Sequence, residues 1–180
     1  GKVTDVMRKN MTLNGVKWFA CGISIVLHPV NPFVPTVHCN YRMFELYNEN
    51  DEVSDQWFGG GTDLTPYYLF EEDARHFHQT YKNVCDQFDP LLYPEFKRKC
   101  DDYFVNTHRN NERRGIGGIF YDHQRPDEKH DADFWMNFSK ACANTFVPSY
   151  VPIVEKRKNT PFTSEQKHWQ EIRRGRYDEF

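Results

Sequence analysis

Two neighbouring strand-like segments carry polar side chains that could bind an organic anion and move a proton. They are Ser24 and His28 in residues 16–28, and His38, Asn40 and Arg42 in residues 36–47. Each set alternates with apolar residues, so its members share one strand face, about 6.5–7 Å apart. Arg42 could grip a carboxylate, His38 could transfer a proton, and Asn40 could orient the ligand. The alternative is a solvated sheet face with incidental histidines.

A carboxylate follows a glycine triplet. A third strand is expected over residues 55–61, ending in Gly59, Gly60 and Gly61, and Asp63 comes two residues later. Glycines allow a tight turn or a close backbone approach. Asp63 at such a turn could accept N–H bonds, including those of pyrrole rings. The alternative is an aspartate that only stabilises the turn or caps a helix.

Arginines gather beside glycines in residues 108–118 and again in residues 173–176. In a chain with a net charge of -3, this clustering favours local binding of carboxylates or phosphates. Surface ion pairs are the alternative. The glycine spacing matches neither a dinucleotide-binding fingerprint nor a P-loop, so no nucleotide site is predicted.

Four histidines lie near segments that could converge on a metal ion: His28, His38, His78 and His108. Histidine is the commonest transition-metal ligand, but none of these belongs to a compact ligand pair such as H-E-x-x-H. His78 also falls on the apolar stripe of a predicted helix, which favours a core position.

Length and composition limit the remaining choices. A chain of 180 residues predicts one domain, spanning residues 1–180. The net charge of -3 and the pI near 6.3 argue against a nucleic-acid surface. No apolar stretch approaches the roughly 18 residues that span a bilayer. The five cysteines lack C-x-x-C spacing and are predicted to be reduced core residues.

The element order predicts an α+β fold. After the early strands, helices are expected from Glu71, around residues 93–104, over residues 133–146 and from Thr163. The inner face of the second helix is expected to carry Tyr93, Phe96, Cys100, Tyr103 and Phe104. At the start of the last helix, Thr163 and Gln166 fit a capping box. A glycine-bent strand is expected over residues 115–121, and the last residues up to Phe180 are strand-like. Strands before helices predict an antiparallel sheet flanked by helices.

Five phrases in order closely resemble the oxygen-dependent coproporphyrinogen III oxidase family. They are TVHCNYR (36–42), WFGGGTDLTPYY (57–68), CDDYF (100–104), RRGIGGIFYD (113–122) and RRGRYDEF (173–180). The resemblance implies a large, flat antiparallel sheet sandwiched between helices, and a homodimer. It also implies a single catalytic domain that is truncated at both ends relative to the family.

The implied activity is oxidative decarboxylation of two propionates of coproporphyrinogen III to vinyl groups, which gives protoporphyrinogen IX in haem biosynthesis. Dioxygen is the co-substrate, and no cofactor is implied. By resemblance His38 is the proton donor, and Asp63 lies near the pyrrole nitrogens. The positions of substrate contacts fall on Ser24, Asn40, Tyr41 and Arg42, and Arg114 holds a propionate or shapes the cleft. Metal positions of bacterial members match the four histidines named above, which stay candidates.

Two other functions remain open at this point. A non-catalytic tetrapyrrole carrier would use the arginines but would need no paired Asp and His. A metal-dependent hydrolase would use the four histidines. The expected location is cytoplasmic, with the mitochondrial intermembrane space as the alternative.

Overall fold

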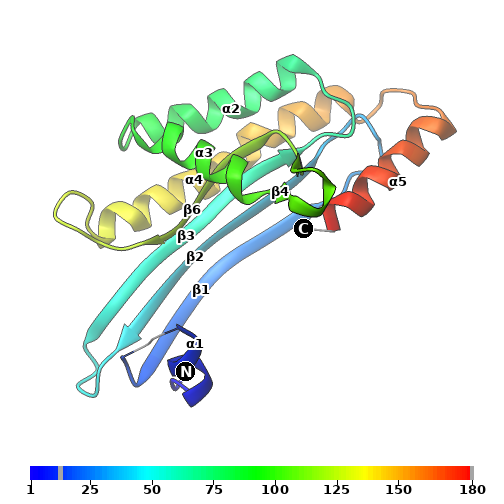
Figure 1. Ribbon diagram of the computed structural model, residues 1–180. Coiled ribbons are helices and arrows are strands. Elements are labelled where there is room, and N and C mark those ends of the chain that lie inside the picture. The colour runs from blue at the N-terminus through cyan, green and yellow to red at the C-terminus, as the bar shows by residue number, and fades with distance from the viewer. Residues whose placement is uncertain (12–13, 179–180) are drawn as a thin grey trace.

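The computed structural model describes residues 1–11 and 14–178 and shows a four-stranded antiparallel sheet with helices packed on it (Figure 1). The sheet has the order β1 (Lys17–Leu27), β2 (Thr36–Tyr47), β3 (Val53–Thr65), β6 (Gly117–Gln124). The strands β4 (Val105–Asn106) and β5 (Glu112–Arg113) form a separate pair around the short helix η1 (Thr107–Arg109). The helices are α1 (Asp5–Met11), α2 (Glu71–Asp86), α3 (Leu92–Tyr103), α4 (Ala132–Arg157) and α5 (Ser164–Asp178). The predicted α+β class is confirmed.

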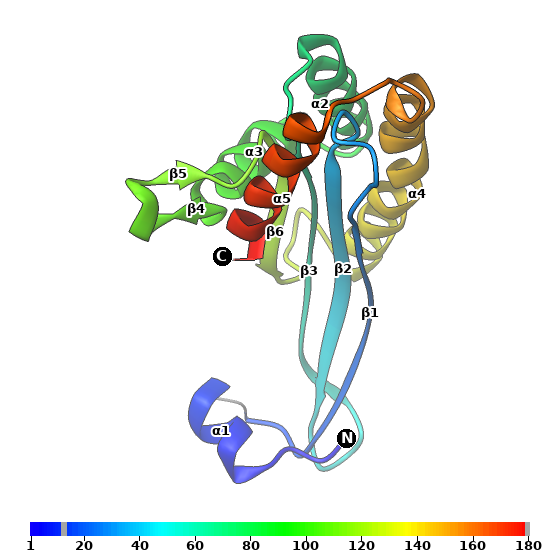
Figure 2. The same ribbon diagram turned by 90° about the vertical axis from the view of Figure 1, so that its right-hand side faces the viewer.

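The two faces of the sheet differ in chemistry. One face packs against α2, α3 and α4 and supplies the largest buried cluster, with Val37, Tyr41, Leu64, Ile119 and Tyr121 all nearly inaccessible. The opposite face carries the polar residues of β2, because side chains alternate along a strand. The helices α1 and α5 lie toward opposite ends of the strands (Figure 2). Both predicted strands are confirmed, and burial alternates in the first half of β2. The half-buried alternation predicted for β1 is wrong, because this edge strand leaves Phe19, Ile23 and Leu27 exposed.

The apolar stripe of α2 is also confirmed, since Phe77, Tyr81 and Cys85 are fully buried. In α3 the prediction holds for Phe96 and Cys100, but it is wrong for Tyr103, which is half exposed. Helix α3 lies along the edge strand β6, with the Phe96 ring stacked on Tyr121 from the covered face. At its C-terminal end the Tyr103 ring reaches the other face of the sheet and stacks on Phe120.

Helix α4 is longer than predicted, since it continues past residue 146 through Pro148 and Pro152. Proline removes a helical N–H donor, so the N–H that would bond the carbonyl of Pro148 is missing at Pro152. The His76 Nε2 lies 3.0 Å from that carbonyl oxygen and replaces the lost partner.

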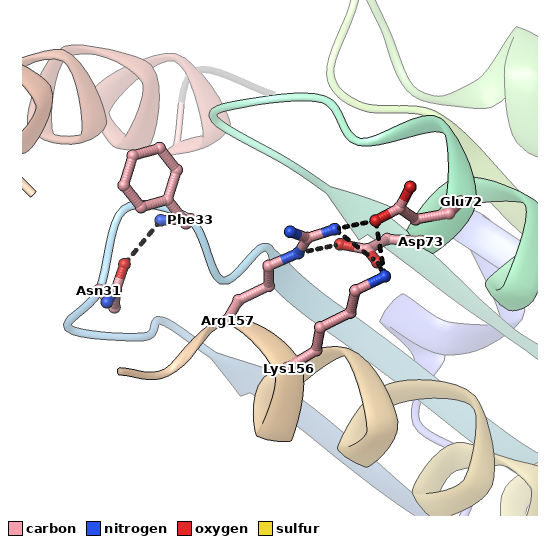
Figure 3. Close-up of polar contacts among 6 residues, drawn as sticks. All are labelled: Asn31, Phe33, Glu72, Asp73, Lys156 and Arg157. Atoms are coloured by element: carbon pink, nitrogen blue, oxygen red, sulfur yellow. Dashed lines mark hydrogen bonds and ion pairs between the residues drawn. The ribbon is translucent and has the colours of Figure 1, made fainter. Parts of the chain in front are cut away.

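The far end of α4 is fastened to the start of α2 by an ion-pair cluster (Figure 3). Arg157 donates from Nε to Asp73 at 2.8 Å and from Nη2 to Glu72 at 2.6 Å. Its guanidinium also lies 3.6 Å from the centre of the Phe70 ring. These tertiary contacts outweigh the local helix-breaking tendency of the prolines.

Strand β3 does not end at the glycines. It continues through the triplet to Thr65, so the prediction that Asp63 sits at a sharp glycine turn is wrong. The glycines allow neighbouring residues to pack closely against β3, and they do not form a turn. An added Cβ would lie 2.4 Å from the Ile119 carbonyl oxygen at Gly61, and 2.6 Å from the Tyr41 ring at Gly60. Strand β6 likewise begins at Gly117, two residues later than expected.

Helix α5 begins with the predicted capping box. The Gln166 N–H donates to Thr163 Oγ1 at 3.2 Å, and the Thr163 N–H donates to Gln166 Oε1 at 2.9 Å. The strand expected near residue 180 is not seen, because α5 continues to Asp178; the last two residues of that phrase lie outside the described residues.

Four of the five cysteines are buried as predicted, whereas Cys21 on the edge strand β1 is exposed. All five are free thiols. Across residues 1–11 and 14–178, none of the helices has the length and apolar character that crossing a membrane requires.

Candidate active site

Strand register brings the predicted polar residues together on the face opposite α2 and α4. In the sheet, His38 pairs with Asp63, Asn40 with Gly61, and Arg42 with Gly59. Ser24 of β1 stands opposite Asn40 on the other side of β2. Residues directly opposite each other share a face, so β2 supplies a row of polar groups and β3 adds one carboxylate beside it.

A pocket of ≈ 270 Å³ lies on this face. Its lining comprises His38, Asn40, Arg42, Gly60, Gly61, Asp63, Tyr103, Phe104, Arg114 and Phe120. The glycines give it a floor without side chains, and the three rings give it apolar walls. Such a combination of flat floor, aromatic walls and a few polar groups suits a planar ligand that carries acidic substituents.

At the base of the pocket, Asp63 joins a histidine to an arginine. Its Oδ1 lies 2.8 Å from His38 Nδ1, and its Oδ2 accepts a hydrogen bond from Arg114 Nη2 at 2.6 Å. Asp63 is only 2% exposed, whereas the His38 side chain is 21% exposed. A carboxylate acceptor favours a proton on Nδ1 and so leaves the Nε2 lone pair available to a ligand. His38 is therefore the group through which this pair can exchange protons with the pocket.

Arg114 is held more tightly than a surface cation. Its side chain is 6% exposed, and its guanidinium carbon lies 3.8 Å from the centre of the Phe104 ring and 4.3 Å from that of Tyr177. A cation between two aromatic faces is favourably placed. Arg114 contacts Asp63 and so gives this buried carboxylate a counter-charge.

Arg42 differs from Arg114 because it reaches toward solvent. Its side chain is 43% exposed, its Nη1 donates to Asn40 Oδ1 at 3.2 Å, and its Nη2 lies 3.0 Å from Asp122 Oδ2. The site therefore has one buried cation at its base and one exposed cation at its rim.

Some predicted residues do not line the pocket. The ring of Tyr41 is on the opposite face of the sheet, buried and hydrogen-bonded to Thr62, so its side chain cannot contact a ligand on the polar face. Ser24 lies on the correct face of β1 but outside the pocket lining. His28 follows the end of β1, where its Nδ1 lies 3.2 Å from Thr36 Oγ1.

The four candidate metal ligands are not assembled. Within the described part of the chain, no three or more His, Cys, Asp or Glu side chains come together as a metal-binding group. His38 binds Asp63, and His78 on α2 is partly buried, with a buried Nδ1 that has no hydrogen-bond partner among the described residues, so it is not the satisfied core histidine expected from its stripe position. Burial, and next the nearby Lys97 charge, lower the pKa of His78 to about 4, so this ring is neutral at physiological pH.

Four pocket or rim residues were not predicted as functional: Tyr103, Phe104, Phe120 and Asp122. Phe104 and Tyr103 were interpreted as the inner face of a helix, because helical periodicity cannot show that the end of α3 passes the edge of the sheet. Phe120 alternates with the buried Tyr121 along β6, and that alternation alone could have placed it on the polar face.

Comparison with known proteins identifies the family of this chain. A family model described as coproporphyrinogen III oxidase matches residues 1–180. The oxygen-dependent coproporphyrinogen-III oxidase of Hordeum vulgare, named as chloroplastic, is 56% identical over 168 residues, covering 92% of this chain and 42% of the relative. The Drosophila melanogaster oxidase is 55% identical over 163 residues (91% and 40%), and the mitochondrial Homo sapiens oxidase is 53% identical over 161 residues (89% and 34%).

The chain spans less than half the length of these relatives. Within that span the match includes every strand of the sheet and every residue of the pocket. The chain belongs to the coproporphyrinogen III oxidase family.

Proposed function

We propose that this chain forms the catalytic part of an oxygen-dependent coproporphyrinogen III oxidase, which converts two propionates of coproporphyrinogen III to vinyl groups and yields protoporphyrinogen IX. The observation that carries the proposal is the Arg114–Asp63–His38 series at the base of a glycine-floored pocket. A carrier needs cations and a flat surface, but it needs no buried carboxylate oriented on a histidine. The relatives are named as oxidases with this dependence on oxygen.

The chemistry assigns each group a task. A porphyrinogen pyrrole is electron-rich, so loss of its N–H proton lets dioxygen attack the ring. For each propionic acid side chain, the carboxyl carbon leaves as carbon dioxide and the two hydrogens removed pass to dioxygen, which becomes hydrogen peroxide. His38 Nε2 takes up the pyrrole N–H proton and later returns a proton. Asp63 holds the His38 imidazole in place and stabilises its charged form. The remaining rate acceleration comes from holding the substrate close to His38 in a fixed orientation.

Asp63 therefore acts mainly through His38. Both of its oxygens are already engaged, and little of its surface reaches the pocket. Direct contact between Asp63 and pyrrole N–H groups would have to use the small part of the carboxylate that reaches the pocket. The Asn40 amide and the Arg42 guanidinium remain on the rim, where carboxylate substituents of the ligand would meet them.

The first prediction concerns Arg42. Arg42→Ala in the full-length protein should raise KM by about 10- to 100-fold, since a hydrogen bond to a charged group is worth about 1.5–3 kcal/mol. The side chain is partly exposed, so the melting temperature should change little. Steady-state kinetics at varied coproporphyrinogen III, beside thermal unfolding, make the test. An unchanged KM would remove Arg42 from the binding site.

The second prediction concerns metal. We propose that the reaction uses no metal and no organic cofactor, with dioxygen as co-substrate. Turnover should survive exhaustive dialysis against EDTA, measured by porphyrin fluorescence after oxidation of the product. Loss of activity with EDTA, and its return with one equivalent of a single metal ion, would contradict the proposal and favour a histidine-based centre.

Partners and location are also proposals. We expect a homodimer, as the family resemblance implies, and no nucleic-acid partner, in keeping with the net charge of -3. A cytoplasmic location remains the prediction, with the mitochondrial intermembrane space as the alternative. The barley and human relatives carry the words chloroplastic and mitochondrial in their names, which favours testing an organelle location by fractionation.

The experiment that tests the function mixes full-length protein with coproporphyrinogen III under anaerobic conditions and then admits air. An oxidase holds the ligand unchanged until oxygen arrives and then forms vinyl product. A carrier shows the binding step alone.

A further inference from the structure

We propose that Asp122 is a positioning residue that fixes the guanidinium of Arg42 for carboxylate binding, and that Gly59 is a glycine because this ion pair occupies the space of its side chain. The inference rests on the proposed function for the identity of the ligand. It assigns a role to two residues outside the predicted site, one on β6 and one on β3.

The contacts of Arg42 fix both ends of its guanidinium. Nη2 lies 3.0 Å from Asp122 Oδ2, and Nη1 donates to Asn40 Oδ1 at 3.2 Å. A guanidinium carries five N–H donors in one plane, so these two contacts fix the plane and leave donors for a further carboxylate. Without Asp122, a half-exposed arginine would sample many rotamers, and binding would have to order it.

Gly59 provides the space for this arrangement. It stands directly opposite Arg42 in the register of β2 and β3. An added Cβ at Gly59 would lie 2.6 Å from Asp122 Oδ1 and 3.1 Å from Arg42 Nε. The carboxylate and the guanidinium thus meet above a residue that has no side chain. A side chain at this position would require the carboxylate or the guanidinium to shift.

The backbone conformation of β6 also directs the Asp122 side chain toward Arg42. The pairing of β3 with β6 shifts register between Phe58 and Gly60, and His123 adopts a left-handed conformation with φ 52. A bulge of this kind re-aims a side chain beside a functional site. The turned backbone lets the His123 N–H donate to Asp122 Oδ1 at 2.9 Å, while Oδ2 lies 3.0 Å from Arg42 Nη2 and 3.4 Å from His123 Nδ1. A non-glycine residue rarely adopts a positive φ without such compensation.

The contacts of Arg42, the space above Gly59 and the bulge in β6 together hold the Asp122 carboxylate against the Arg42 guanidinium. Arg114 is paired with Asp63 in the pocket base, so Arg42 is the pocket-lining arginine that reaches toward solvent. Its orientation therefore decides how well a ring carboxylate is held and how the ring is placed over His38. Asp122 acts through Arg42 and need not touch the ligand.

The test is a double-mutant cycle in the full-length protein. Binding of coproporphyrinogen III is measured without oxygen, by quenching of tryptophan fluorescence, and turnover is measured separately under air. Asp122→Ala should weaken binding about tenfold, within the range for coupled charged neighbours. In an Arg42→Ala background, the same substitution should change Kd by less than about twofold, because no guanidinium remains to be positioned. Asp122→Asn, which keeps an acceptor oxygen, should give an intermediate Kd.

Gly59→Ala should weaken binding like Asp122→Ala, and Gly175→Ala is the matched control because an added Cβ there meets nothing within 4 Å. An equal effect of Asp122→Ala in both backgrounds would show a merely structural role and overturn the proposal. Tighter binding by Asp122→Ala would also overturn it, since the carboxylate would then compete with the ligand. If the wild type binds but forms no product under air, the oxidase function fails, while the anaerobic cycle still decides the role of Asp122.

Discussion

Asp63→Asn in the full-length protein will lower turnover by about 100-fold or more, the usual scale for loss of general acid–base catalysis. Asn can keep its amide oxygen toward Arg114 only by turning its amide NH₂ toward His38 Nδ1. That nitrogen must then accept, so Nε2 carries the proton and His38 can no longer take one from the ligand. The measurement is turnover per folded molecule, from oxygen uptake and porphyrin fluorescence.

The same variant will be less stable, because it removes the negative charge from the buried Arg114–Asp63 ion pair. Breaking a buried pair by removing one partner costs about 3–5 kcal/mol. His38→Ala is the matched control, since it leaves the Arg114–Asp63 pair intact and should slow turnover with little loss of stability. Near-normal turnover in folded Asp63→Asn protein would contradict the mechanism, although membership of the family would stand.

Gly118→Ala will destabilise the protein by about 3 kcal/mol, the upper end of the usual cost of overpacking. The added Cβ would lie 1.9 Å from the Thr62 carbonyl oxygen and 3.1 Å from the Asp63 Cα. Both are backbone atoms of β3, which cannot move without breaking the β3–β6 ladder. Because Gly118 pairs with Asp63, the displaced backbone lies next to the catalytic carboxylate.

The measurement for Gly118→Ala is urea unfolding followed by far-UV circular dichroism. Gly175→Ala in the interior of α5 is the control, and it should raise stability by about 0.5–1 kcal/mol, because alanine is the better helix former. Wild-type stability in Gly118→Ala would show that β6 does not pack as closely on β3 as described.

The sequence predicted those parts of the fold that depend on contacts between residues close together in the chain. Strict alternation in β1 and β2 identified the two strands and correctly placed His38, Asn40 and Arg42 on one face. The reciprocal hydrogen bonds of Thr163 and Gln166 follow from four residues of sequence. Each of these features needs only neighbours in the chain.

Features that depend on distant contacts could not be predicted in this way. Glycines 59–61 locally allow either a tight turn or a close backbone approach, and the sequence alone does not choose between them. Their actual reason is close packing against Tyr41 and Ile119 and space for Arg42 and Asp122. Asp63 was expected at an exposed turn, and its burial between His38 and Arg114 was not foreseen.

The same limit applies to α4 and to the rim of the pocket. Pro148 and Pro152 locally predict the end of a helix, whereas the contacts with α2 and the core burial of Tyr150 and Ile153 favour its continuation. The aim of Asp122 depends on a register shift between β3 and β6, which is a property of two strands far apart in the chain.

The most direct test of the catalytic account is the stoichiometry of the reaction after anaerobic binding. Full-length protein, freed of metal by EDTA, is loaded with coproporphyrinogen III, and air is then admitted while dioxygen uptake, carbon dioxide release and vinyl formation are followed together. We expect one dioxygen consumed and one carbon dioxide released for each vinyl group, and a rate at least about 100-fold lower with Asp63→Asn. Bound ligand that stays unchanged in air, or wild-type rates in the folded Asp63→Asn protein, would contradict it.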